Sequence, residues 1–441
     1  MSTYQTPPVL RTLERCIEQS LLHHEAAKLS LLRTRDDAAR NEAAAYDALL
    51  AHNPAGMPLA GAILTVKSCF DVAGWVSHAG SRVLAKAQPA SQDAPLVARL
   101  RQAGAVLRAQ TNMAEFAYGA LGLNPWYGTP TTPLMPDKLC VAGGSSSGAA
   151  VATALGMANL ALGSDTSGSV RIPAAFCGVA GFKPSRGRYS DEGLLHLSPS
   201  FDVPGLIATT AAMCRQADHA IAGCNKYAPI EAGVSLEGLR LIVPEAWLSS
   251  QLDATVGQAF ELWLNRLASA GAQIQVRRLP MLAEAGRVAS EGGIIAAEAY
   301  QLHAHRLDEN LPAYDSRVGP RMLLGAEVKA HLYVSALKRL RALAAEYNSA
   351  LKWADAVLTP TVPMLPPSLA SLQDDDIYTS QNRRAFHITE FANRLDAPSI
   401  SLPGNLRQRQ PVGLLRTGKR GCDTTLLIMA ECIERVLTAH S

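Results

Sequence analysis

Apolar residues recur along this chain with two different spacings, which mark helices and strands. Between residues 7 and 50, apolar side chains such as Leu13 and Ile17 return every three or four residues, and this spacing predicts two helices. The apolar run Leu59–Val66 that follows predicts a buried strand ending at Lys67. The chain is therefore expected to begin with two helices and to continue into a buried strand.

The helix and strand signals then alternate. A helix over 93–102, with Asp93 placed to cap it, precedes a strand over 105–109. A helix of small residues over 149–157 precedes a strand over 158–163. Later segments predict strands at 239–243, 272–278, 354–360 and 397–404, helices at 255–270 and 423–437, and surface loops at 185–235 and 364–380. Residues 286–350 are expected to be mostly helical, with breaks at Pro312 and Pro320. This rhythm predicts an α/β architecture.

Composition excludes several classes of protein. Of the 441 residues, 48% are hydrophobic and 18% charged, which allows a large core and argues against disorder. The formal net charge of +3 gives no electrostatic footprint for nucleic acid. The longest apolar run, residues 149–162, is shorter than the ~20 residues that a bilayer requires. We therefore expect neither a nucleic-acid partner nor a membrane.

The cysteines and histidines show no metal-binding spacing. The eight cysteines form no CxxC pair, so neither a zinc site nor a disulfide framework is indicated. No histidines are arranged as HExxH, and no metal or other cofactor is expected. Scattered cysteines suit a reducing cytoplasm, and the N-terminus lacks the charged and apolar regions of a signal peptide. A cytoplasmic location is expected.

One block, residues 143–184, contains two Gly/Ser clusters, GGSSSG and SDTSGS, joined by a run of small and apolar residues. Glycines let a backbone approach a ligand closely, and serine hydroxyls can attack a carbonyl or relay a proton. A phosphate-binding loop also places glycines before a helix, but its motif needs a lysine that is missing here. From the residues alone, a structural turn and a catalytic one remain equally open.

The block resembles the amidase signature, which defines a family of serine amide hydrolases. It matches as GGSS followed by LGSDTSGSVRIPAAFCGVAGFKP, and weaker similarity runs through GAILTVKSCFDVAGWVSHAGS, TNMAEFAYG, LNPWYGTP and DAVLTPTVP. The resemblance implies a central mixed β-sheet covered by helices on both faces. It also implies a single amidase domain over residues 1–441, whose N-terminal helical segment, residues 1–55, could pack a homodimer.

The resemblance further implies a Ser–Ser–Lys triad. Ser169 in SDTSGS matches the nucleophile, Ser145 in GGSSSG the bridging serine, and Lys67 the base. A serine hydroxyl needs a positioned base near neutral pH, and a lysine can act as one only when burial keeps it neutral. Since a hydroxyl both donates and accepts, Ser145 can take the proton of Ser169 and pass its own to Lys67.

Two further features of the site follow from the same resemblance. A cis peptide bond is expected between Gly144 and Ser145, and an oxyanion hole is expected from the backbone N–H groups of Thr166, Ser167, Gly168 and Ser169. We expect Asp165 to hold this turn through backbone N–H groups and Arg171 to pin the loop. The sequence departs from the family at Ser147, which stands where a glycine is usual, and at Ser68, where many members have Asp.

The substrate is only coarsely defined. The resemblance assigns Ala117, Tyr118 and parts of residues 290–325 and 360–400 to the pocket walls. Arg317 and Arg321 could bind a carboxylate or form surface salt bridges instead. We expect an amidohydrolase that cleaves a small carboxamide or ureido C–N bond through a serine acyl-enzyme. The alternatives are a glutaminase component of a tRNA-dependent amidotransferase and an inactive interaction protein, although the three intact triad residues argue against the latter.

Overall fold

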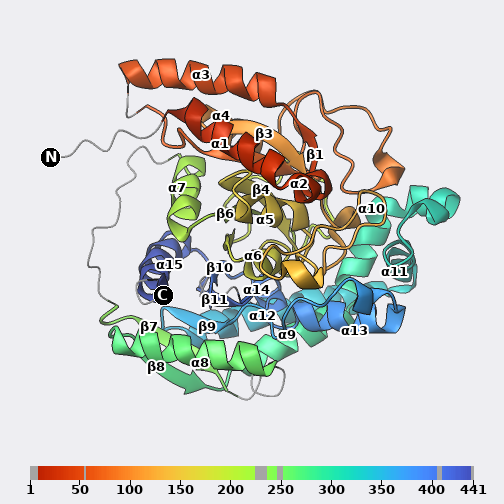
Figure 1. Cartoon of the computed structure of the whole chain (residues 1–441). Coiled ribbons are helices and arrows are strands. Elements are labelled where there is room, and N and C mark those ends of the chain that lie inside the picture. Colours follow the sequence, from red (N-terminus) through yellow and green to blue (C-terminus); the bar gives the residue numbers. More distant parts are fainter. Residues whose placement is uncertain (1–7, 54–55, 224–235, 246–251, 405–409, 439–441) are drawn as a thin grey trace.

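The computed structural model describes residues 8–53, 56–223, 236–245, 252–404 and 410–438, and within these ranges eleven strands form a mixed sheet (Figure 1). The strands are β1 Leu31–Thr34, β2 Ile63–Lys67, β3 Val106–Thr111, β4 Leu160–Asp165, β5 Ala180–Lys183, β6 Val203–Ala208, β7 Arg240–Pro244, β8 Gln273–Arg277, β9 Ala356–Pro360, β10 Ser399–Pro403 and β11 Gly413–Thr417. Their order across the sheet is β1-β3-β2-β4-β6-β5-β10-β11-β9-β7-β8.

Fifteen α-helices surround this sheet within the described ranges. They are α1 Val9–Leu22, α2 His24–Ser30, α3 Asp36–His52, α4 Pro95–Gln102, α5 Ser147–Ala154, α6 Arg171–Cys177, α7 Ala211–Ile221, α8 Ala254–Ser269, α9 Pro280–Glu291, α10 Ile294–Asn310, α11 Gly319–Leu323, α12 Ala330–Ala350, α13 Asp375–Phe386, α14 Glu390–Arg394 and α15 Asp423–Thr438. In the part of the chain that the structure describes, no helix combines the length and apolar character needed to span a bilayer.

Alternate strand residues point to opposite faces of the sheet, and this alternation decides which helices they contact. On one face, Leu64 and Leu162 belong to a core shared with α4, α7, α8 and α15. On the other, Ile63 packs with α1 and α3, Ala161 with α5 and α6, and Val357 with α9, α12 and α14. The expected mixed sheet with helices on both faces is confirmed.

The parallel strands bring two segments with predicted site residues to one edge of the sheet. β2 pairs in parallel with both β3 and β4, whereas β4 pairs antiparallel with β6. The carboxyl ends of parallel strands lie at the same edge, so Lys67 at the end of β2 lies beside Ser164 and Asp165 at the end of β4. The site is therefore assembled where the apolar strands end.

Some predicted elements were wrong. The described part of the predicted two-helix segment, residues 8–50, contains α1, α2, most of α3 and the strand β1. The strand was missed because a four-residue edge strand carries too short a pattern to distinguish from a helix. Asp93 does not cap α4: the cap is Ala94, and the Asp93 carboxylate accepts from the Ala73 N–H and pairs with Arg101.

The two predicted surface loops also contain regular structure. β6 and α7 lie within 185–235, of which residues 224–235 are outside the described part of the chain. The segment 364–380 includes the start of α13. Strands β5 and β11 and helix α14 were missed, since each spans only four or five residues. These short elements depend on neighbours distant in sequence, which local periodicity does not report.

Candidate active site

Lys67 is the last residue of β2, and its side chain is completely buried. The amine Nζ lies 2.7 Å from Ser145 Oγ and 2.8 Å from Ser164 Oγ. Ser164, in β4, is the first serine of SDTSGS. It was not singled out from the sequence, because nothing in the motif distinguishes it from the other serines. The strand ends thus hold the amine between two hydroxyl groups.

Burial lowers the pKa of Lys67, because the charged ammonium form is poorly solvated inside the protein. Cys69, Asp165 and Asp202 act in the opposite direction through their charge, but burial dominates. A neutral amine can accept a proton, whereas an ammonium group cannot. The environment of Lys67 therefore favours the form that a base requires.

Ser145 lies in the GGSSSG loop that leads into α5. The peptide bond between Gly144 and Ser145 is cis, which confirms the expectation from the family resemblance. The backbone of Gly122 lies so close to Gly144 that a Cβ there would sit 2.6 Å from the Gly122 nitrogen, so only glycine fits. The Ser146 N–H donates to the Ser169 carbonyl oxygen at 3.1 Å and joins this loop to the next one.

Asp165 organises the loop that carries Ser169, as predicted. Its carboxylate accepts hydrogen bonds from the N–H groups of Gly168 at 2.8 Å and Val170 at 3.1 Å. Arg171 donates to the same carboxylate through Nε at 3.0 Å and Nη2 at 2.8 Å, and to the Thr389 carbonyl oxygen at 2.9 Å. Burial acts to raise the pKa of Asp165, but the charge and hydrogen bonds of Arg171 hold it well below its usual range.

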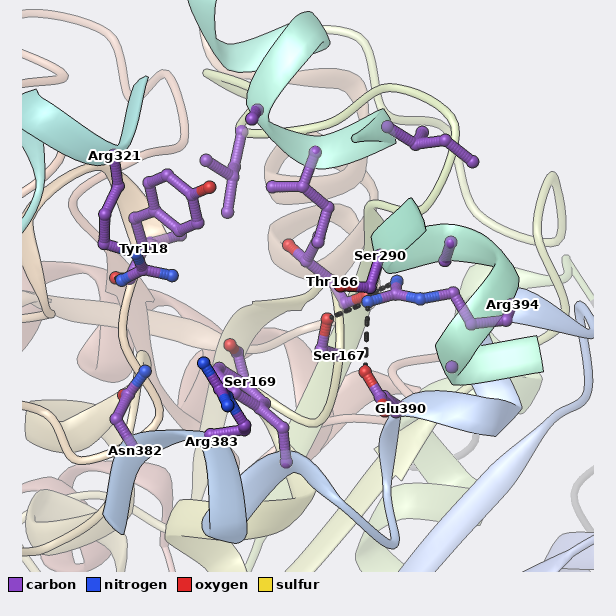
Figure 2. Close-up of a pocket in the computed structure, with 18 of the residues that line it drawn as sticks. Tyr118, Thr166, Ser167, Ser169, Ser290, Arg321, Asn382, Arg383, Glu390 and Arg394 are labelled. Atoms are coloured by element: carbon purple, nitrogen blue, oxygen red, sulfur yellow. Dashed lines mark hydrogen bonds and ion pairs between the residues drawn. The ribbon is translucent and has the colours of Figure 1, made fainter. Parts of the chain in front are cut away.

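Ser169 lines a cavity of about 330 Å³ (Figure 2), whereas Lys67 and Ser145 are not among the residues that line it. The Ser169 Oγ atom is buried and has no hydrogen-bond partner among the residues that the structure describes. The structure thus brings together the base and the bridging serine through a hydrogen bond. It does not contain the corresponding bond between Ser145 and Ser169, and the catalytic roles of the three residues stay predictions.

The expected oxyanion donors differ in how they are engaged. The Gly168 N–H is already bonded to Asp165, which leaves it poorly placed for a substrate oxygen. Within the described ranges, the N–H groups of Thr166, Ser167 and Ser169 have no acceptor. We therefore remove Gly168 from the candidate donors and retain the other three.

The cavity wall separates the two arginines that the sequence could not distinguish. Ala117 and Tyr118 line the cavity, and Arg321 lies with them, donating to the Tyr118 carbonyl oxygen at 2.9 Å with its guanidinium 3.9 Å from the centre of the Tyr118 ring. Arg317 is not a lining residue: its Nε is 2.7 Å from the Asp375 carboxylate and its Nη2 donates to the Leu372 carbonyl oxygen. The assignment of Arg317 to the substrate pocket is corrected accordingly.

Arg394 in α14 contacts the loop that carries Ser169 and was missed in the sequence. It donates to the Thr166 carbonyl oxygen at 3.0 Å and to Ser167 Oγ at 2.8 Å, from a position 227 residues further along the chain than Ser167. Its guanidinium is also 3.5 Å from the Glu390 carboxylate (Figure 2). No local motif links α14 to the loop, so only the fold reveals this contact.

Comparison with known proteins identifies the family. The model of the Amidase family matches residues 11–427. The chain belongs to the amidase family. It is 35% identical to the 2-amino-5-chloromuconic acid deaminase of Comamonas testosteroni, over 96% of this chain and 92% of the relative. It is 32% identical to a glutamyl-tRNA(Gln) amidotransferase subunit from Burkholderia pseudomallei, over 90% of this chain and 88% of that one.

A solved amidase structure has the same fold. It superimposes with a TM-score of 0.86 at 33% identity, and the match covers 97% of this chain and 96% of the other. The resemblance to the amidase signature family is thereby confirmed, and the chain is a hydrolase acting on C–N bonds.

Proposed function

We propose that this chain is an amidohydrolase that cleaves the C–N bond of a small amide with Ser169 as the nucleophile, Ser145 as the bridging serine and Lys67 as the base. The observation that carries the proposal is the buried Lys67 amine, held 2.7 Å from Ser145 Oγ in the loop whose Ser146 N–H donates to the carbonyl oxygen of Ser169, a residue that lines the cavity. A buried amine with a lowered pKa beside a hydroxyl is a costly arrangement, and such groups concentrate at catalytic sites.

The reaction begins when Ser169 Oγ attacks the carbonyl carbon of an amide in the cavity. The hydroxyl proton passes to Ser145 Oγ while the Ser145 proton moves to the neutral Nζ of Lys67. The carbonyl oxygen gains negative charge and faces the N–H groups of Thr166, Ser167 and Ser169, each of which is worth about 3 kcal/mol of transition-state stabilisation in comparable enzymes.

The tetrahedral intermediate then collapses by breaking its C–N bond. The proton returns from Lys67 through Ser145 to the leaving nitrogen, which departs as ammonia or an amine and leaves an acyl ester on Ser169. A water molecule adds to this ester with its proton taken by the same relay. Cleavage of the ester bond releases the carboxylic acid and restores the Ser169 hydroxyl.

The size of the cavity supports a small substrate. About 330 Å³ lies at the lower end of the volumes that enclose small-molecule ligands. The relative from Comamonas testosteroni, a deaminase of 2-amino-5-chloromuconic acid, is named for a small compound that loses nitrogen. Its identity of 35% exceeds the 32% of the amidotransferase component, which favours a free-standing enzyme over the glutaminase alternative. The single domain, the homodimer and the cytoplasmic location stay predictions.

The test combines fluorophosphonate labelling with an ammonia-release screen of aliphatic, aromatic and ureido amides on the purified chain alone. We expect an adduct on Ser169 and turnover that Ser169→Ala lowers by at least about a thousandfold while thermal unfolding is unchanged. Ser147→Ala is the matched control, because its buried hydroxyl has no partner among the described residues. Full activity of Ser169→Ala, or glutaminase activity that appears only with partner proteins, would refute the proposal.

A further inference from the structure

The ionisable groups around the cavity are not balanced in charge. Among the described residues that line it, three arginines, Arg321, Arg383 and Arg394, face a single carboxylate, Glu390. Arg394 is engaged with that carboxylate and with Thr166 and Ser167. Burial also raises the pKa of Glu390, which weakens its negative charge. Two positive charges therefore remain without a carboxylate in the wall.

Arg383 has no partner of its own. The side chain of Arg383 makes no hydrogen bond, ion pair or ring contact with any described residue. It belongs to the face of α13 that lines the cavity, together with Thr379, Asn382 and Phe386, which are spaced as neighbours on one side of a helix. The next residue, Arg384, lies outside this face and its Nη2 is 2.6 Å from the Asp253 carboxylate.

Arg321 is held in place on a different side of the cavity (Figure 2). Its hydrogen bond to the Tyr118 carbonyl oxygen and its position over the Tyr118 ring fix the guanidinium without neutralising it. Within the described ranges it forms no ion pair. A negatively charged group in the cavity would thus meet one guanidinium that is oriented and one that is free to reach it.

A third part of the wall is apolar. The end of α9 and the start of α10 contribute Ala289, Gly293, Ile294 and Ala296 to the lining. A ligand that suits both the apolar wall and the two arginines needs a short hydrocarbon body and a negatively charged end. A neutral amide would leave the two guanidinium groups without a counter-charge.

We propose that the substrate carries a carboxylate in addition to its amide, and that Arg383 binds this carboxylate and so determines specificity. The inference rests on the proposed amidase function, since it places the carboxylate in the cavity that Ser169 lines. A guanidinium group matches a carboxylate through two parallel hydrogen bonds, whereas a carboxamide of equal size offers one acceptor oxygen and no charge. The substrate class is the monoamide of a short dicarboxylic acid.

Matched pairs of amides test this directly. Succinamate and fumaramate differ from succinamide and fumaramide only in having a carboxylate where the diamide has a second carboxamide. We expect wild-type kcat/KM to favour each acid by roughly ten- to hundredfold. Arg383→Gln should abolish this preference, mainly by raising KM for the acids, while the diamides change less than about twofold. Arg341→Gln, which removes a charge from α12 away from the cavity lining, should keep the preference.

A binding measurement separates this inference from the proposed function. In the Ser169→Ala background, calorimetry with the unsubstituted diacids from malonate to adipate, including muconate, should detect binding that Arg383→Gln weakens by a similar factor. Suppose that diacids bind through Arg383 but the wild-type protein neither releases ammonia from any amide nor forms a fluorophosphonate adduct on Ser169. This result would support the carboxylate site and refute the amidase proposal. The inference is overturned if no diacid binds, if Arg383→Gln retains the preference, or if acids and diamides lose activity together.

Discussion

Replacing Lys67 with methionine removes the candidate base while keeping a side chain of similar length. Wild-type Lys67 is completely buried, with Nζ 2.7 Å from Ser145 Oγ and 2.8 Å from Ser164 Oγ. A positioned general base contributes about 10²–10⁴-fold to a rate. We therefore expect Lys67→Met to lower kcat by this factor, which corresponds to about 3–5 kcal/mol of transition-state stabilisation.

The effect on stability should be much smaller. The variant loses two hydrogen bonds worth about 0.5–1.5 kcal/mol each and leaves Ser145 Oγ without a partner. In return, the cost of burying an amine disappears. We expect the free energy of unfolding to change by no more than about 2 kcal/mol, which is small beside a typical stability of about 5–15 kcal/mol. Urea unfolding should therefore show a folded protein that has lost its activity.

The pH dependence identifies which lysine acts. A base must be neutral, so kcat rises with pH through the pKa of Lys67, and burial places this rise below the ordinary lysine value of 10.5. Lys183 is also fully buried, with its pKa lowered to about 7, but its Nζ bonds to the Pro184 carbonyl oxygen and it does not line the cavity. It provides the matched control. The acid limb should vanish in Lys67→Met and persist in Lys183→Met.

The assay is ammonia release between pH 5 and 10, with urea unfolding of each variant at pH 7. Stability should follow the same titration with a definite sign. Between the lowered folded pKa and 10.5, unfolded Lys67 binds more protons than folded Lys67, so wild-type stability relative to Lys67→Met rises with pH. Activity of Lys67→Met within tenfold of wild type, or an acid limb that survives in it, would refute the assignment.

Two further substitutions test the loop that carries Ser169, the proposed nucleophile. Asp165→Ala leaves the buried Arg171 without its carboxylate, and urea unfolding should show a loss of stability of about 3–5 kcal/mol. Arg171 holds the pKa of Asp165 low in the folded protein. The stability difference between wild type and variant is therefore fully present above the unfolded pKa of 3.8 and should shrink as the pH falls through the lower folded pKa. Equal stability at neutral pH would contradict this account. Gly168→Ala places a Cβ against Thr389 at a φ of +135°, which costs a strain of about 1–3 kcal/mol, so the melting temperature should fall. The value of kcat should also fall, because the Ser169 N–H is displaced. Unchanged kinetics would show that the loop does not depend on this glycine.

The family resemblance, and not local periodicity, pointed to three segments that the fold brings together, although the catalytic roles of their residues stay predictions. Lys67, Ser145 and Ser169 each lie in a short segment whose glycines, serines or apolar residues constrain its path, and two of the segments end parallel strands at one sheet edge. The hydrogen bonds within the site were only partly predicted. The bond between Lys67 and Ser145 is present, but the N–H of Gly168 serves Asp165 instead of facing the cavity.

The resemblance indicated only the broad segments that form the cavity walls, and the individual contacts could not be predicted. Arg317 and Arg321 are four residues apart, and only the tertiary fold decides that the first meets Asp375 and the second meets the Tyr118 carbonyl oxygen. Arg394 reaches the nucleophile loop across more than half of the chain. Such contacts depend on tertiary packing, which periodicity and composition do not encode.

The chain divides chemistry from recognition along its length. The three candidate catalytic residues lie between positions 67 and 169, whereas the walls opposite them come largely from residues 286–296 and 378–394. A mutation in α9, α10 or α13 can therefore reshape what the enzyme accepts without changing the proposed relay residues, whereas α14 carries Arg394, which contacts the loop that holds Ser169. Substrate specificity can therefore diverge through changes in the wall residues alone. This makes α9, α10 and α13 the natural targets for a directed-evolution library that seeks activity on new amides.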